Sequence, residues 1–324
     1  MRNAFMQAIF DACERREDLM ILSGDAGLGV FDDFQKRHPD RFLNLGVAEQ
    51  NMVSFAAGLS LAGFKPILYN IIPVLMYRGY EQIRNDICYQ KLPVILAGIG
   101  SGLTYAPQGM THYSLEDIGL GQTLPNLTIL SPMDPLEAKM SAGYAMEAGT
   151  PVYVRLPKRG EPTFHERDFF DISKPQILRP GSEIAILFHG SIAEEVFRAH
   201  EELVRAGIHP MIISLPMVQP LDPETLLEIL QGVKTVICVE EHYENCGLGN
   251  ILARFHAKYE PGWRLETMGV PHRFIHEVLD TRGMREYCGL SSSHISAAVR
   301  SRVGGKRLPL RLENRLQAQE NMGG

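Results

Sequence analysis

The stretch Leu45-Gly46-Val47-Ala48-Glu49-Gln50-Asn51-Met52 decides the fold prediction, because it joins a short apolar run to a long apolar helix. Residues 41–45 predict a strand, and the helix is expected from Val47 to Ala62. Apolar residues occur on nearly every side of that helix, which indicates a buried helix. Its first turn carries Glu49, a carboxylate that the helix dipole favours but that burial penalises unless a partner bonds it. Glu49 is therefore either a ligand-binding group or an N-terminal capping residue.

Composition and charge exclude several classes of protein. The chain has 324 residues, enough for two domains, with 45% hydrophobic and 22% charged residues. The formal charge is 32 − 38 = −6 and no basic block interrupts it, so we expect no nucleic-acid partner. No apolar run approaches membrane-spanning length, and the N-terminus shows no signal-peptide layout. Five scattered cysteines without a C-x-x-C pair indicate reduced thiols, so a cytoplasmic protein is expected.

Strands and helices alternate along the chain, which predicts an α/β fold of two doubly wound domains. The first domain is expected over residues 1–160, and a polar, proline-rich linker over residues 161–182. A second, smaller α/β domain is expected over residues 183–304, and residues 305–324 lack apolar periodicity and predict a mobile tail. The expected strands of the first domain are residues 19–22, 41–45, 66–72, 92–98, 127–130 and 151–156, and its helices include residues 2–16, 76–89 and 135–148.

Two loops of the first domain have the composition of ligand-binding segments. Residues 23–29 form a glycine-rich turn at the end of a strand, but they lack the G-x-G-x-x-G spacing of a dinucleotide site. Asp25 in that turn is either a ligand-binding residue or a turn residue that bonds its own backbone. The long loop of residues 100–112 is rich in glycine and typical of functional loops. His272 and His276 lack partners at ligand spacing, so we expect no metal site.

Residues 41–66 and the motif Gly109-Met110-Thr111-His112 together resemble the pyrimidine-binding domain of the transketolase family of thiamine diphosphate enzymes. The run Glu240-Glu241-His242 before Gly247-Leu248-Gly249 resembles the family's C-terminal domain, and the resemblance covers residues 1–303. The same order of domains is found in the C-terminal part of 1-deoxyxylulose-5-phosphate synthase. The resemblance implies that Glu49 hydrogen-bonds N1′ of the cofactor's aminopyrimidine, which favours the imino tautomer that activates the thiazolium carbon.

The resemblance also implies roles for residues around the cofactor. His112 is implied to face the substrate and to move protons there, although a lone loop histidine is more often structural. Asp25 occupies the place of a family aspartate near the cofactor, and Arg78 that of an arginine facing the active site. Leu75 stands where the family has a phenylalanine that stacks on the pyrimidine, so an apolar wall is kept and aromatic stacking is lost.

Substrate-binding residues are implied in the same way. Arg155 matches the family arginine that meets a substrate phosphate or carboxylate, for which a planar guanidinium is suited. Arg2 is placed like a phosphate-contacting arginine, with a solvated surface charge as the alternative. Gln108 replaces an aspartate that contacts a sugar hydroxyl, and Gly100 replaces a histidine. These replacements favour a related ketose over an unmodified pentose phosphate.

The family's diphosphate-binding motif is missing from this chain, because no G-D-G followed by a magnesium-binding asparagine occurs. We therefore expect a split enzyme in which a partner subunit carries the diphosphate-binding domain and holds most of the thiamine diphosphate and its Mg²⁺. The expected assembly is an α2β2 heterotetramer with a β–β core that transfers a two-carbon ketol unit from a ketose to an aldose. The alternatives are a β subunit of a 2-oxo acid dehydrogenase and a non-catalytic homologue.

Overall fold

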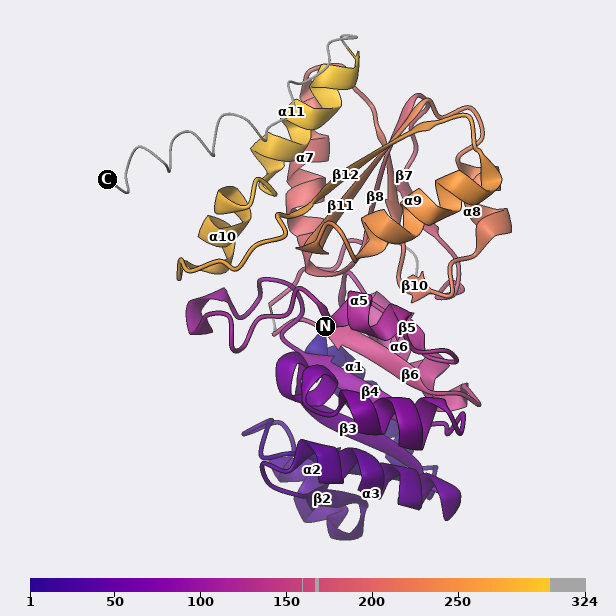
Figure 1. Ribbon diagram of the computed structural model, residues 1–324, viewed down its shortest axis with the longest axis vertical. Coiled ribbons are helices and arrows are strands. Elements are labelled where there is room, and N and C mark those ends of the chain that lie inside the picture. Colours follow the sequence, from indigo (N-terminus) through magenta and orange to yellow (C-terminus); the bar gives the residue numbers. More distant parts are fainter. Residues whose placement is uncertain (159, 167–168, 304–324) are drawn as a thin grey trace.

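Two α/β domains lie one above the other along the long axis of the computed structural model, and the N-terminus lies where they meet (Figure 1). The structure describes residues 1–158, 160–166 and 169–303, so the predicted tail of residues 305–324 lies outside the described residues. The α/β class with two domains, predicted from the alternation of elements, is confirmed.

The first domain is built on a seven-stranded sheet in the order β10-β5-β6-β4-β3-β1-β2, within the described part of the chain. Its strand pairings are parallel, apart from the antiparallel pairing of β10 with β5. The strands are β1 (Leu19–Ser23), β2 (Phe42–Asn44), β3 (Lys65–Ile71), β4 (Ile95–Ile99), β5 (Thr128–Leu130), β6 (Val152–Leu156) and β10 (Met217–Gln219).

Helices cover both faces of this sheet, because successive strand side chains point to opposite faces and both sets are apolar. One set packs with α1 (Arg2–Cys13) and α6 (Pro135–Glu147), and the other with α3 (Glu49–Leu61) and η3 (Ile83–Cys88). The first set includes Ile21, Ile67, Ile95 and Val154, and the second includes Leu22, Leu68, Leu96 and Tyr153. The remaining elements are α2 (Asp32–Arg37), η1 (Pro39–Arg41), η2 (Pro73–Tyr77), α4 (Tyr80–Gln82), η4 (Ala106–Gln108) and α5 (Asp117–Gln122).

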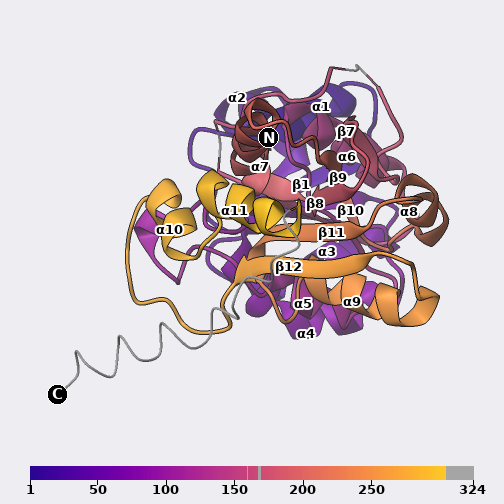
Figure 2. The ribbon, with the colours of Figure 1, turned by 90° about the horizontal axis from the view of Figure 1, so that it is seen from above.

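The second domain contains a five-stranded sheet in the order β12-β11-β8-β9-β7, again within the described residues. Its strands are β7 (Gln176–Arg179), β8 (Ile184–Phe188), β9 (Met211–Ser214), β11 (Thr235–Tyr243) and β12 (Arg264–Val270). Figure 2, a view from above, shows helices on both sides of this sheet. They are α7 (Ala193–Arg205) and α11 (Ser292–Val303) on one side, and α8 (Pro223–Ile229) and α9 (Leu248–Tyr259) on the other; η5 (Gly190–Ile192) and α10 (Thr281–Tyr287) complete the domain.

Two short strands lie outside the places that the predicted division into two domains and a linker gives them. Strand β7 falls within the predicted linker of residues 161–182, where it pairs antiparallel with β9. Strand β10 follows β9 in the chain, yet it pairs with β5 at the edge of the first sheet. Both strands are short and lack a strong apolar pattern, so only their tertiary pairing reveals them. One hydrophobic core cluster consequently runs through both domains.

Two predictions about helices of the first domain are also wrong. The expectation that the helix of residues 47–62 is buried on all sides fails, because Phe55 and Leu61 of α3 are 40% and 67% exposed. The sheet covers only one side of α3, which buries Met52 and Val53 there. The predicted helix of residues 76–89 is instead three short segments, and two of them, η2 and η3, are π-helical.

Candidate functional site

Several of the predicted site residues follow strands that end at one edge of the first sheet. Strands β1, β2, β3, β4 and β6 are parallel, so their carboxyl ends lie along a common edge. The segments that follow these strands carry Asp25, Glu49, Arg78, His112 and Lys158 in that order. Ligands of open α/β sheets bind at this edge, which makes it the candidate active site.

Glu49 is the first residue of α3, and its carboxylate is almost fully buried, with 2% of the residue exposed. Nη1 of Arg78 donates a hydrogen bond to Oε2 of Glu49 at 2.7 Å, while the Arg78 side chain is itself 50% exposed. The N-cap residue, Ala48, provides no side-chain cap for the helix. The bonding of the Glu49 carboxylate therefore fits a ligand-binding group better than a helix cap, and the structure brings Glu49 and Arg78 together.

Asp25 is exposed at this edge of the sheet, whereas Leu75 is buried in the core. Asp25 is exposed in a turn with φ +56°, and its backbone N–H donates a 2.9 Å hydrogen bond to Oδ1 of Asn44. This contact joins the turn after β1 to the last residue of β2. Leu75 is fully buried in the core beneath α3, so it does not form the open apolar wall that the family resemblance implied.

His112 lies in the loop after β4 and is partly exposed. Its Nδ1 is 2.9 Å from Oγ1 of Thr111, and its ring meets the Tyr105 ring edge-on with centroids 6.3 Å apart. Gln108 ends the short helix η4 in the same loop and is exposed. The imidazole of His112 is therefore open to a substrate at the sheet edge.

The segment that follows His112 is fixed by the Tyr77 hydroxyl of η2. This hydroxyl lies 2.6 Å from Oγ of Ser114 and donates a 2.7 Å hydrogen bond to Oε2 of Glu116. Burial and the neighbouring carboxylates raise the pKa of Tyr77, so the phenol remains a hydrogen-bond donor at neutral pH. The loop that carries His112 is thus held at both ends, by β4 and by this cluster.

Positive charge gathers around Tyr105. Nζ of Lys158 lies 5.1 Å from the centroid of the Tyr105 ring, which is a cation–π distance. Arg2 acts on both Tyr105 and Tyr69: burial raises the pKa of each phenol, to about 12 for Tyr69, and the Arg2 charge opposes that rise. Arg2 also donates two hydrogen bonds of 3.0 Å to Oδ1 of Asn3.

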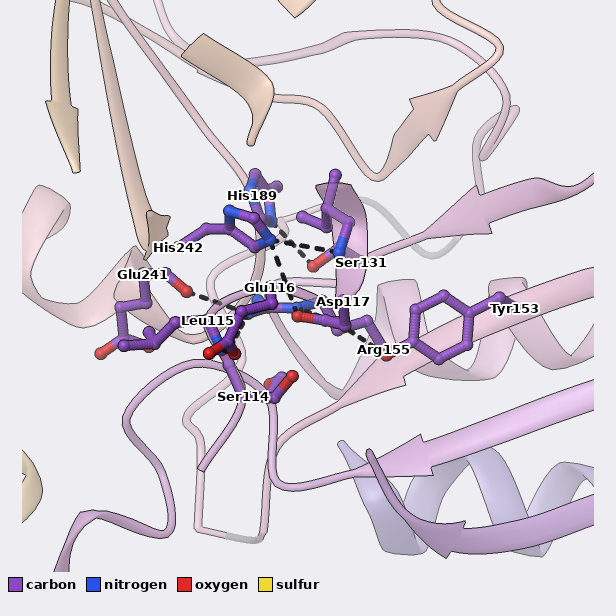
Figure 3. A network of polar contacts seen from close by, with 12 residues as sticks. Ser114, Leu115, Glu116, Asp117, Ser131, Tyr153, Arg155, His189, Glu241 and His242 are labelled. Atoms are coloured by element: carbon purple, nitrogen blue, oxygen red, sulfur yellow. Dashed lines mark hydrogen bonds and ion pairs between the residues drawn. The ribbon is translucent and has the colours of Figure 1, made fainter. Parts of the chain in front are cut away.

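The structure places Arg155 away from any open site, contrary to the role that the resemblance implied. Arg155 is 1% exposed, and its Nε bonds Oδ2 of Asp117 at 2.7 Å. Its Nη2 donates to the carbonyl oxygens of Ser114 at 3.0 Å and Glu241 at 2.9 Å (Figure 3). A guanidinium bonded to these partners joins the two domains and is not available to bind a substrate.

Buried ionisable groups of both domains surround Arg155 (Figure 3). Burial acts to raise the pKa of Asp117, but the charge of Arg155 and the hydrogen bonds that Tyr153 and Arg155 donate outweigh it and hold that pKa below its usual value. Nε2 of His242 accepts a 3.1 Å hydrogen bond from the backbone N–H of Ile118, so the second domain caps the start of α5 in the first. Because Nε2 is an acceptor, His242 is neutral here.

Sequence reasoning missed three residues of this region: Tyr105, Lys158 and Asp117. Lys158 follows Arg155 closely, and its charge at the end of a strand was the one available signal. Tyr105 and Asp117 carried no local signal, because their contacts are with residues distant in the sequence. Within the described residues, no group of three or more His, Cys, Asp or Glu side chains is placed to hold a metal ion. The helices of the described ranges include none that is long and apolar enough to cross a membrane.

Comparison with known proteins adds family evidence to this geometry. Residues 1–162 match the model of the transketolase pyrimidine-binding domain, and residues 173–295 match the model of the transketolase C-terminal domain. The chain is 32% identical to one of the subunits of the apulose-4-phosphate transketolase of Actinobacillus succinogenes, covering 91% of this chain and 96% of that protein. It is 30% identical to a putative transketolase C-terminal section of Methanocaldococcus jannaschii, covering 92% and 95%.

Other relatives are longer than this chain. The chain is 34% identical to the 1-deoxy-D-xylulose-5-phosphate synthase of Brevibacillus brevis but spans only 44% of that enzyme. A solved structure described as a split-gene transketolase in an inactive β4 tetramer aligns with a TM-score of 0.85 and 29% identity, over 94% of this chain and 99% of that one. The transketolase of Campylobacter jejuni aligns with a TM-score of 0.76 at 18% identity, over 90% of this chain and 45% of that one, which shows the shared fold.

Proposed function

Because the chain belongs to the transketolase family and carries the family's pyrimidine-binding and C-terminal domains, we propose that it is one subunit of a split, thiamine diphosphate-dependent transketolase. The proposed reaction moves a two-carbon ketol unit from a ketose to an aldose. Near-complete coverage of the apulose-4-phosphate transketolase relative supports the split arrangement, since that protein is also a subunit. The matched part of the 1-deoxyxylulose-5-phosphate synthase relative, by contrast, is only 44% of that enzyme.

The observation that carries the proposal is the position of Glu49. Its buried carboxylate stands at the carboxyl edge of the sheet, at the positive end of α3, and meets a side chain that is half exposed. A carboxylate with these properties fits the aminopyrimidine of thiamine diphosphate, whose N1′ nitrogen needs a group with which to share a proton. When bound, the cofactor would supply the nucleophilic carbon for the transfer. Arg78 holds one oxygen of Glu49, which orients the carboxylate and leaves the other oxygen for N1′.

His112 and Gln108 are the proposed substrate-facing residues of this chain. The imidazole of His112 can take a proton from a substrate hydroxyl or donate one to a developing alkoxide. Thr111 bonds its Nδ1, so Nε2 is the atom that can exchange a proton with substrate. Gln108 is exposed on the same loop, where its amide can bond a sugar hydroxyl. Asp25 completes the edge as a further polar group, in the turn after β1.

A partner subunit is part of the proposal. The described residues supply a carboxylate and an arginine for the pyrimidine end of the cofactor but no cluster suited to Mg²⁺, so a second chain would bind the metal and the diphosphate. The similar split-gene transketolase is described as an inactive β4 tetramer, which supports the view that chains of this kind need another subunit for activity. We propose an α2β2 assembly with a β–β core.

The test of this proposal is Glu49→Gln in the complex assembled with the partner subunit. Glutamine keeps the size and the hydrogen bond from Arg78, but it cannot share a proton with N1′. Hydrogen–deuterium exchange at the thiazolium carbon of the cofactor is expected to slow by ~10²–10⁴-fold, the range of acid–base roles. Melting temperature and partner binding are expected to remain unchanged, because Arg78 is half exposed and tolerates the loss of its partner's charge.

Glu17→Gln is the matched control, because Glu17 is exposed and lies outside the site. Exchange at the wild-type rate in Glu49→Gln, with a loss of about 1 kcal/mol in stability, would identify Glu49 as a structural residue of α3 and remove the basis of the proposal.

A further inference from the structure

The turn η2 brings together two neighbouring residues that reach different parts of the candidate site. Arg78, which follows η2, donates a 2.7 Å hydrogen bond from Nη1 to Oε2 of Glu49 at the head of α3. Tyr77, the last residue of η2, reaches the segment after β4 instead. Its hydroxyl donates a 2.7 Å hydrogen bond to Oε2 of Glu116 and lies 2.6 Å from Oγ of Ser114.

Ser114 closes the loop that carries His112. Its backbone N–H donates a 3.1 Å hydrogen bond to the carbonyl oxygen of Gly102, so the two ends of the loop meet there. Within the loop, the Tyr105 ring meets the His112 ring edge-on and fills the space over Gly100, where an added Cβ would lie 2.5 Å from Cε2 of the ring. The loop is therefore a packed unit, and the place of its closed end decides the place of His112.

The Tyr77 hydroxyl fixes this closed end from the side of η2. The Glu116 oxygen that accepts the Tyr77 hydrogen bond also accepts a 2.9 Å hydrogen bond from the backbone N–H of Leu115. Because the phenol donates its one proton to Glu116, the Ser114 hydroxyl is the donor in its contact with the phenol oxygen. Hydrogen bonds to a charged carboxylate are roughly twice as strong as those between neutral groups. One hydroxyl thus holds the closed end both directly and through Glu116.

The position of η2 is set by its packing against α3. Leu75 of η2 is fully buried beneath that helix. Gly79 allows the close approach, because a Cβ there would lie 2.8 Å from the carbonyl oxygen of Leu75 and 3.2 Å from Cγ2 of Val53. The turn is π-helical, a rare geometry that is frequent at functional sites. A single turn therefore lies between the helix that Glu49 heads and the closed end of the His112 loop.

We propose that Tyr77 is a positioning residue of the proposed reaction: its hydroxyl sets the place of the His112 loop relative to the Glu49 carboxylate. This inference rests on the proposed function for the roles of Glu49 and His112, whereas the hold on the loop does not depend on it. Tyr77 contacts neither substrate nor cofactor and acts through the two side chains that its hydroxyl bonds. Loss of the hydroxyl is expected to impair proton transfer at His112 and to spare the Glu49 carboxylate, which Arg78 still holds.

The hold on the loop is tested on the full chain without a partner. Hydrogen–deuterium exchange mass spectrometry follows the backbone amides of Ser114 and Leu115, which are both bonded at the closed end. Tyr77→Phe removes only the hydroxyl and is expected to speed their exchange about tenfold, because a hydrogen bond to a carboxylate is lost. Tyr80→Phe is the matched control, since the Tyr80 hydroxyl on α4 bonds Thr123 outside the site. Equal exchange in wild type and Tyr77→Phe would overturn the inference.

The effect on the reaction is measured in the complex assembled with the partner subunit, with fructose 6-phosphate as the ketose and glyceraldehyde as the aldose. Tyr77→Phe is expected to lower kcat about tenfold to a hundredfold at unchanged KM, because a displacement of His112 on the order of 1 Å weakens an interaction made in the transition state. Hydrogen–deuterium exchange at the thiazolium carbon is expected to keep its wild-type rate. A merely structural Tyr77 would lower both rates together, with a fall in melting temperature, and that result would contradict the positioning role.

Glu116 provides a second test of the same contact. Glu116→Ala is expected to lower kcat as Tyr77→Phe does, and Glu116→Gln to retain most of the activity, because its amide oxygen can still accept the Tyr77 hydrogen bond. The double variant Tyr77→Phe and Glu116→Ala is expected to be no slower than Glu116→Ala alone, since both changes remove one interaction. Losses in kcat that multiply would show that the two side chains act separately and would overturn the inference.

The two proposals fail separately. Ketol transfer at the wild-type rate by the Tyr77→Phe complex would remove this inference and leave the proposed function. Amide exchange at Ser114 that depends on the Tyr77 hydroxyl, in a complex that transfers no ketol unit, would keep the hold on the loop and remove the transketolase reaction.

Discussion

Glu49 and Arg155 are both buried charged residues, but their bonding partners give them different roles. Glu49 is bonded by an arginine that is half exposed, so the pair faces the place where a ligand would enter. Arg155 is bonded by Asp117 and by two carbonyl oxygens, all of them enclosed between the domains. The residue that the family resemblance implied as a substrate-binding group is therefore a structural link in this chain.

Replacement of Arg155 is expected to affect stability more than substrate binding. Arg155→Met leaves the Asp117 carboxylate buried without its cation, which typically costs ~3–5 kcal/mol in the free energy of unfolding. Urea denaturation of the full chain measures this loss. Asp117→Asn is expected to be costly as well, and the double variant to lose less than the sum of the two, since neither charge is then left alone.

Arg15→Met serves as control for the Arg155 prediction, because Arg15 is exposed just after α1. A stable Arg155→Met chain whose assembled complex shows a raised KM for an anionic substrate would return Arg155 to the substrate site.

At the scale of elements, the two domains are joined by a helix cap that crosses between them. Helix α5 belongs to the first domain, and β11 of the second supplies His242 to the first backbone N–H groups of that helix. Burial lowers the pKa of His242 below its ordinary value of 6.5, and the charge of Arg155 adds to this, while Asp117 and Glu240 act to raise it. The net direction is down, so the folded protein holds this histidine neutral.

Because the folded protein keeps His242 neutral, we expect the folded state to lose stability in mild acid. In the unfolded chain, His242 binds a proton below about pH 6.5. In the folded chain it binds one only at a lower pH, because folding lowers its pKa. The stabilisation is therefore complete above pH 6.5 and is lost as the pH falls below it. The melting temperature of wild type is expected to fall more steeply from pH 7 to 5.5 than that of His242→Gln, whose amide oxygen can still accept the Ile118 hydrogen bond.

His209→Gln is the matched control for the cap, since His209 is exposed in the second domain. Its pH profile is expected to follow wild type. Parallel profiles for wild type and His242→Gln would show that the cap does not titrate in this range.

At the scale of the whole molecule, the exposed side of α3 is an apolar surface near the candidate site. Val47, Phe55, Leu61 and the following Phe64 are 71%, 40%, 67% and 39% exposed. Side chains of this size are favoured in protein interfaces. In the β–β core that we propose, a second copy of this chain is the expected partner for this surface.

Charge placed on this surface is expected to separate the copies. The double variant Phe55→Glu and Leu61→Glu should elute as a smaller species than wild type in size-exclusion chromatography with light scattering. It should also fail to give ketol transfer when the partner subunit is added, and wild type without that partner should be inactive with thiamine diphosphate and Mg²⁺. Val204→Glu, an exposed apolar position on α7, is the control. Unchanged size of the double variant would place the interface elsewhere.

The sequence by itself determined the α/β alternation, the two-domain organisation and the polar residues in the segments that follow the parallel strands. Glu49 and His112 could be singled out because each stands in a local motif that resembles one of the transketolase family, in a segment that follows a strand. The pairing of β7 and β10, the burial of Arg155 and Leu75, and the position of Tyr105 over Gly100 were decided only by the tertiary structure. These features depend on contacts between segments distant in the chain, and no local pattern encodes which buried partner a side chain will meet. The exposed side of α3 has the same origin: its apolar pattern indicates burial, but only the packed domain shows that the sheet covers one side and leaves the other exposed.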